Sequence, residues 1–157
     1  FIYILSYGCS DLITGIPFEC PDCPIEQQEE IMDCDECWLD ISAPSLEIDE
    51  NGYYHMQVLS GYNQTFTTLE ATTGLSGNHN LVKVGWGTDA YILYEWNGVI
   101  DTITAVNGAT YTGSDGIANT VFSAWPEFVG DTVLVGAAYM DGCFNEHFDY
   151  LNIIIED

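Results

Sequence analysis

The amino-acid sequence predicts an all-β protein: an antiparallel β-sandwich preceded by an N-terminal strand and a small cysteine-rich segment with one short helix. Short runs rich in Val, Ile, Thr and aromatic residues recur along most of the chain, and Gly, Asn and Asp separate them. Beyond residue 45 no stretch repeats its apolar residues with a helical period. Hydrophobic residues make up 47 % of the chain, which is enough to build a core.

The first element is an uncharged strand in residues 1–10, which we treat as a separate unit. Its large side chains are those of Phe1, Ile2, Tyr3, Ile4, Leu5 and Tyr7. Because an exposed apolar strand aggregates, we expect it to fill its own sandwich or to complete that of a neighbouring copy. The Gly8-Cys9 pair also fits a lipid-modified cysteine, although Tyr7 is large where a small residue is usual.

Residues 11–43 form an acidic, cysteine-rich segment. A short helix is expected at 24–32, because Pro24 lies near its first position and acidic residues occupy its first turn. Two Cys-x-x-Cys pairs bracket this helix, namely Cys20 with Cys23 and Cys34 with Cys37. Four thiolates at this spacing can surround Zn²⁺, whereas an oxidising compartment favours disulfides. We favour disulfides because few basic groups are present to support a dianionic zinc centre.

The two remaining cysteines are Cys9 and Cys143. A bridge between them would tie the N-terminal strand to the last hairpin and stabilise the fold by about 4–5 kcal/mol. The alternative is a link between two copies of the chain. An even number of cysteines in a chain this poor in lysine is typical of extracellular proteins.

Residues 44–157 are expected to form the sandwich. The turn Asp49-Glu50-Asn51-Gly52 predicts a hairpin, and Asn97-Gly98 predicts another. The expected strands cover residues 46–48, 53–59, 65–71, 81–86, 90–96, 99–106, 119–124, 132–140 and 150–155. Strands at this spacing are typical of a β-sandwich.

The segment Tyr94-Glu95-Trp96-Asn97-Gly98, followed by residues 131–139 with Tyr139, resembles two strands of immunoglobulin-like and PKD-like modules. These are the central Trp strand and the late Tyr strand of modules found in bacterial surface and virion proteins. The resemblance covers about residues 80–157 and implies a structural or adhesive sandwich without catalysis. Two features depart from it: Cys143 follows Tyr139 by four residues rather than two, and no cysteine precedes Trp96 on an early strand.

The charge of the chain excludes several functions. Lys83 is the sole basic residue apart from histidines, against 25 Asp and Glu, so the net charge is −24. Such a chain lacks the cations that bind nucleic acid, anionic lipid or phosphate. We expect an extracellular or cell-surface protein in salt-rich surroundings. The apolar start of the chain is too short to span a membrane.

Other candidate sites are weaker. The histidines His55, His79 and His147 are scattered without a nucleophile motif, so we expect no catalytic residues and no enzyme. We expect no cofactor, with Ca²⁺ or structural Zn²⁺ as the alternatives. Residues that offer turn oxygens to Ca²⁺ are Asp49, Glu50, Asn51, Ser114 and Asp115. Asn63-Gln64-Thr65 is an N-glycosylation sequon.

These observations predict an extracellular structural subunit of a filament, surface layer or virion, which assembles with other copies through its apolar N-terminal strand. The alternative is a cell-surface adhesion module that recognises a glycan or a protein with the help of aromatic residues and Ca²⁺.

Overall fold

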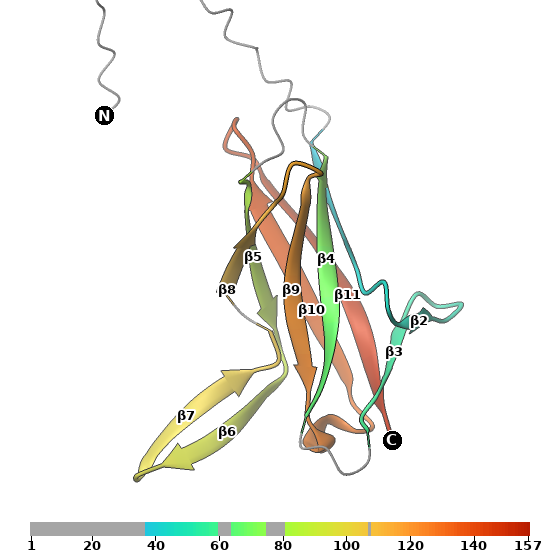
Figure 1. Ribbon diagram of the computed structural model, residues 1–157, viewed down its shortest axis with the longest axis vertical. Helices are drawn as coiled ribbons and strands as arrows, with labels where there is room; N and C mark the ends of the chain where they lie inside the picture. The colour runs from blue at the N-terminus through green and yellow to red at the C-terminus, as the bar shows by residue number, and fades with distance from the viewer. Residues whose placement is uncertain (1–36, 60–63, 75–80, 107) are drawn as a thin grey trace, which may run out of the picture. The chain divides into compact units, whose positions relative to one another are not determined.

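The computed structural model describes residues 37–157 except 60–63, 75–80 and 107 (Figure 1). The predicted all-β class is confirmed. In the described ranges the strands are β1 (Trp38–Ser42), β2 (Glu47–Ile48), β3 (Tyr54–Gln57), β4 (Thr65–Gly74), β5 (Lys83–Thr88), β6 (Tyr91–Trp96), β7 (Val99–Thr104), β8 (Gly108–Tyr111), β9 (Ile117–Ala124), β10 (Thr132–Met140) and β11 (Glu146–Glu156). A 3₁₀ turn, η2 (Pro126–Phe128), precedes β10. The predicted N-terminal strand and the helix at 24–32 lie outside these residues.

The strands form two larger sheets and a separate hairpin. One sheet has the order β1-β4-β9, the second has the order β2-β3-β11-β10-β5-β8, and β6 pairs with β7 (Figure 1). Neighbouring strands are antiparallel, with the exception of β3 and β11, which run parallel. The predicted antiparallel arrangement therefore holds for the other described strand pairs and not for this one. The β3–β11 pair lies near the edge of the six-stranded sheet. Strand β3 has only four residues, and β4 is the next strand along the chain.

The core lies between the two larger sheets. Along β10, Val133, Val135, Ala137 and Tyr139 are buried, while the intervening residues face outwards. This alternation is the period-two pattern of a strand with one face on a core. On the opposite sheet, Leu69 of β4 and Phe122 of β9 are fully buried. Ile153 and Ile155 of β11 and Met56 of β3 are fully buried on the same sheet as β10.

The sandwich begins earlier than the sequence predicts. Strand β1 lies in the segment that was assigned to the cysteine-rich region, yet it pairs with β4 from Trp38↔Gly74 to Ser42↔Glu70. Ile41 is buried, and its N–H donates a hydrogen bond of 2.9 Å to the Asp149 carboxylate on the other sheet. The boundary at residue 44 is therefore wrong. In β1 only Leu39 and Ile41 show the alternation of apolar residues that is typical of a strand. Two residues are too few to predict a strand from the sequence.

Strands β6 and β7 form a hairpin outside both larger sheets, and Figure 1 shows it extending away from β5. The predicted turn is confirmed: Asn97 and Gly98 have φ values of 52° and 77°, as a tight hairpin turn requires. The base of the hairpin is fixed, because Ala105 donates to the Ala90 carbonyl at 2.9 Å and accepts from the Ser123 N–H at 2.8 Å.

Candidate functional site

The most unusual surface of the described residues is this hairpin, which we call the β6–β7 arm (Tyr91–Thr104). Its large apolar side chains are exposed, with exposed fractions of 71 % for Trp96, 66 % for Val99 and 69 % for Ile100. Trp96 lies opposite Val99 and shares its face of the hairpin. Because contiguous exposed apolar surface usually marks an interaction site, the arm is a candidate contact surface.

A second candidate surface is an apolar groove on the outer face of the six-stranded sheet. The groove has a volume of about 540 Å³. Its lining includes Gly85 and Gly87 of β5, Gly136 and Ala138 of β10, and Phe148 and Tyr150 of β11. Phe148 and Tyr150 are exposed and lie opposite the small residues Ala138 and Gly136 of β10. We call this the glycine groove.

Lys83 lies close to the glycine groove. It precedes Gly85 by two residues on β5, so the two share the outer face of the sheet. Lys83 is exposed and lies opposite Tyr111 of β8. The positive charge of the chain is therefore placed at the edge of an apolar hollow.

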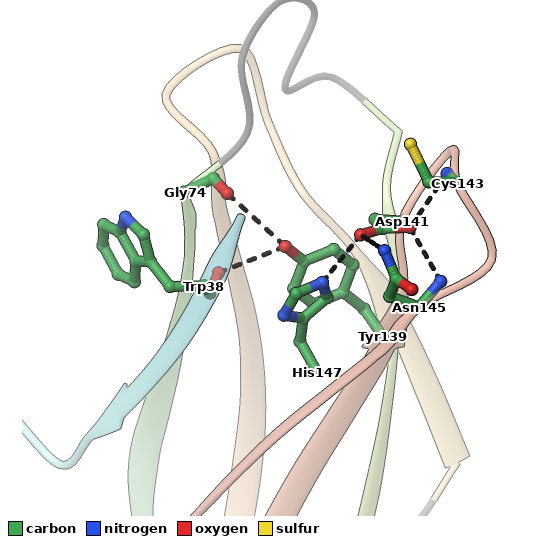
Figure 2. Close-up of polar contacts among 7 residues, drawn as sticks. All are labelled: Trp38, Gly74, Tyr139, Asp141, Cys143, Asn145 and His147. Carbon is green, nitrogen blue, oxygen red and sulfur yellow. Dashed lines mark hydrogen bonds and ion pairs between the residues drawn. The ribbon is translucent and has the colours of Figure 1, made fainter. Parts of the chain in front are cut away.

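A third cluster of polar groups organises the loop between β10 and β11 (Figure 2). The buried carboxylate of Asp141 accepts hydrogen bonds from the backbone N–H groups of Cys143 and Asn145, both at 2.9 Å. It also accepts from the Asn145 side-chain amide at 3.2 Å and pairs with His147 Nε2 at 2.8 Å. These contacts fix the loop, in which Phe144 has a positive φ of 67°.

Tyr139 joins this cluster to the opposite sheet. Its hydroxyl lies within hydrogen-bonding distance of the Trp38 carbonyl at 3.2 Å and of the Gly74 carbonyl at 3.4 Å (Figure 2). Its ring stacks on His147 with a centroid separation of 5.0 Å. Burial, assisted by the neighbouring Cys37 and Asp141, raises the pKa of Tyr139 to about 12. The hydroxyl therefore remains a donor at any physiological pH.

The cluster also contains the described residues best placed to hold a metal ion. Cys37, Asp141 and His147 each offer one ligand atom, and these atoms lie within 4.8 Å of one another. However, both Asp141 oxygens already accept hydrogen bonds from the loop, so the described contacts account for this carboxylate as a structural group. The predicted zinc alternative requires Cys20, Cys23 and Cys34 beside Cys37, and these three lie outside the described residues.

Asp141 should make the protein sensitive to acid. The hydrogen bond with His147, together with those from Asn145 and Cys143, lowers the pKa of Asp141 to about 2 from its ordinary 3.8, against the opposing effect of burial. A lowered pKa stabilises the fold above the ordinary pKa, and this stabilisation is lost as the pH falls from about 4 to about 2. We expect Asp141→Asn to lower the melting temperature at pH 7 and to approach the wild type near pH 2.

The measurement is the melting temperature of both proteins by circular dichroism between pH 2 and pH 7. Glu127→Gln is the matched control, since it removes one negative charge at an exposed position of η2. A constant difference between Asp141→Asn and wild type across this range would contradict the assignment.

In the β2–β3 turn, where calcium ligands were predicted, Asp49 holds the turn together by hydrogen bonds. Asp49 Oδ1 accepts hydrogen bonds from the N–H groups of Asn51 at 2.8 Å and Tyr53 at 2.9 Å. His55 lies between two carboxylates, 2.8 Å from Glu156 and 3.6 Å from Asp49. The hydrogen bond with Glu156 raises the pKa of His55, and the backbone hydrogen bond from Tyr53 lowers that of Asp49. Asp115 similarly accepts from the Ile117 N–H at 3.1 Å.

The structure brings few of the predicted site residues together. Cys37 and Cys143 are the two predicted bridging cysteines in the described ranges, so the disulfide pairings stay predictions. Trp96, which the resemblance places in a central strand, is exposed on the arm instead. The predicted assembly strand, His79 and Asn63 lie outside the described residues.

Neither the glycine groove nor the pairing of Asp141 with His147 was predicted from the sequence. A signal for the groove was present, because Gly85 and Gly87 occupy alternate positions of one strand-like run and Gly136 lies inside another. Asp141 and His147 are six residues apart across a hairpin, a spacing that has no characteristic pattern.

Within the described part of the chain, no helix has the length and hydrophobicity needed to cross a membrane. No protein-family model matches the chain, and no curated protein matches it. Among solved structures, the chain is similar to the crystal structure of Spo0M, a sporulation control protein from Bacillus subtilis, with a TM-score of 0.32 and 14 % identity. The similarity covers 78 % of this chain and 50 % of Spo0M, so this chain spans about half the length of that protein. A likeness this distant shows neither a family nor a function.

Proposed function

We propose that the protein is an extracellular structural subunit that assembles with copies of itself into a filament, surface layer or virion. One observation carries this proposal: the β6–β7 arm exposes large apolar side chains that no described residue covers. A two-stranded hairpin alone is marginally stable in water, so a partner surface would stabilise both the arm and the assembly.

Burial of the arm against another surface is energetically favourable. Covering one large apolar side chain contributes roughly 1.5–3 kcal/mol. Leu93, Trp96, Val99 and Ile100 are all more than half exposed, so a contact with the arm offers several such contributions. Repulsion between copies of net charge −24 opposes association, which is why we expect assembly in salt-rich surroundings, where screening is strong.

Assembly can be tested by measuring the size of the full chain in 0.5 M NaCl by light scattering and electron microscopy. We expect particles much larger than the monomer for the wild type and a monomer for Trp96→Asp. The substitution places a carboxylate on the arm, and a contact cannot bury this carboxylate unless an opposite charge pairs with it. Val121→Asp is the control, since it adds the same charge at an exposed apolar position of β9.

A chain that lacks residues 1–8 should be measured in the same way, since the predicted N-terminal strand is a second source of apolar contacts. If this chain is monomeric while Trp96→Asp assembles, the N-terminal strand rather than the arm makes the contact. A wild-type chain that stays monomeric at high concentration and high salt would refute the structural role.

The adhesion module remains the second candidate, and the exposed rings of Phe148 and Tyr150 at the glycine groove favour it. It predicts a stable monomer whose tryptophan fluorescence responds to added sugars or whose melting temperature rises with Ca²⁺.

A further inference from the structure

The floor of the glycine groove consists of positions where packing does not require glycine. Gly87 lies opposite Gly136, and Gly85 lies opposite Ala138, so the small residues form adjacent rows across β5 and β10. A Cβ atom added at Gly87 would meet nothing within 4 Å, and one at Gly85 or Gly136 would make only an ordinary contact at 3.7 Å. Glycine inside a strand weakens it and often marks a place where a ligand or another chain approaches closely.

The walls of the groove match an apolar occupant. Phe148 lies opposite Ala138 and Tyr150 lies opposite Gly136, so both rings rise beside the small residues on the outer face of the sheet. Leu134 extends the apolar lining along β10. A sugar or a charged peptide would find few polar side chains on this floor, whereas apolar side chains of another chain would be well matched to it.

The tip of the β6–β7 arm has the required chemistry. The run from Trp96 to Ile100 carries no charge and presents Trp96, Val99 and Ile100 to solvent. In a chain of net charge −24, a contact between copies is favourable only where carboxylates do not face one another. The arm tip is such an uncharged surface. The lining of the groove is mostly apolar, and its two carboxylates, Asp89 and Asp149, accept hydrogen bonds from the N–H groups of Leu134 and Ile41.

Charge complementarity supports the same pairing. Lys83 lies on the outer face of β5, two residues from the groove glycine Gly85, and Glu95 lies opposite Ile100 on the arm, so Glu95 and Ile100 share one face of the hairpin. An arm that seats its Ile100 face in the groove brings Glu95 towards the one lysine of the polyanionic chain.

We infer that the β6–β7 arm of one copy docks into the glycine groove of the next copy. This inference rests on the proposed function and names the contact through which the subunits assemble. The arm and the groove are different surfaces, so the contact is heterologous, and a bound pair of copies leaves one arm and one groove unused. Such a contact repeats and produces a ring or an open filament.

The test uses Gly136→Val, which fills the groove floor without touching the arm. Valine has a high strand propensity and its Cβ finds room there, so we expect a melting temperature equal to or above that of the wild type. We expect the same variant to be monomeric. The control is Val121→Leu on β9, which adds apolar volume on a different sheet and should assemble normally. Gly52→Val is unsuitable as a control, because valine would be strained at the positive φ of 83° in that turn.

A mixing experiment separates this inference from the proposed function. Trp96→Asp retains an intact groove and Gly136→Val retains an intact arm, so each alone should be monomeric while an equimolar mixture should form a dimer that cannot grow. Adding Lys83→Gln to the Trp96→Asp partner should weaken this dimer about two- to five-fold, as expected for one exposed ion pair.

The outcomes are distinct. A dimer in the mixture, with monomers in the separate samples, supports docking of the arm in the groove. If Gly136→Val assembles like the wild type, or the mixture stays monomeric while the wild type assembles, the docking is refuted and the structural role stands. If the wild type itself never assembles, the proposed function fails and the docking fails with it.

Discussion

Phe122→Ala is expected to destabilise the protein by about 3–5 kcal/mol, the usual cost of removing a buried aromatic ring. Phe122 is fully buried and is the largest of the fully buried side chains of the described residues. It lies on β9 and faces the core between the two larger sheets, so its removal leaves a cavity that neither sheet can fill without moving. The expected fall in melting temperature is about 6 to 20 °C.

Urea unfolding monitored by tryptophan fluorescence gives the free energy of unfolding directly. Val121→Ala is the matched control, because Val121 is the preceding residue on β9 and is 54 % exposed. We expect this control to change stability by less than about 1 kcal/mol. Equal losses for the two variants would contradict the described packing of β9.

Tyr139→Ala is expected to have the second large effect, again about 3–5 kcal/mol. Tyr139 is buried, its ring stacks on His147, and its hydroxyl reaches the carbonyls of Trp38 and Gly74. Removing the side chain creates a cavity and also takes away the hydrogen bond between the two sheets.

Tyr139→Phe separates these two contributions. It keeps the ring and removes the hydroxyl, so we expect a loss of about 1–3 kcal/mol, the cost of leaving a buried partner unsatisfied. Both variants are measured by urea unfolding at pH 7, where the raised pKa keeps the wild-type hydroxyl protonated. A Tyr139→Phe protein as unstable as Tyr139→Ala would show that the hydroxyl, rather than the ring, dominates.

Much of the fold could be predicted because local patterns determine it. Residues 132–140 form β10 as expected, since their apolar residues alternate cleanly and turn residues flank them. The Asn97-Gly98 turn was also predictable, because few other dipeptides tolerate two successive positive φ values. In these cases the physical cause lies within a few residues of the chain.

The arm and the glycine groove could not be predicted in the same way. The strands from Tyr91 to Thr104 are rich in aromatic and β-branched residues like those of a core strand, and nothing in their sequence shows that the hairpin leaves the sandwich. Whether Trp96 is buried depends on what covers it, and that is a property of the tertiary structure or of a partner. The groove depends on small residues in β5 and β10, which become neighbours only through the pairing of these strands.

The position of Lys83 has a consequence for resistance to digestion. Proteases of the trypsin type cut after lysine or arginine, and the peptide bond between Lys83 and Val84 lies in β5, which is hydrogen-bonded to both β8 and β10. A protease must bind its substrate as a free, extended strand, so this bond is cleavable only after the sheet opens. The folded protein should therefore survive trypsin for as long as its sheet holds, and the rate of cleavage would report how often the sheet comes apart.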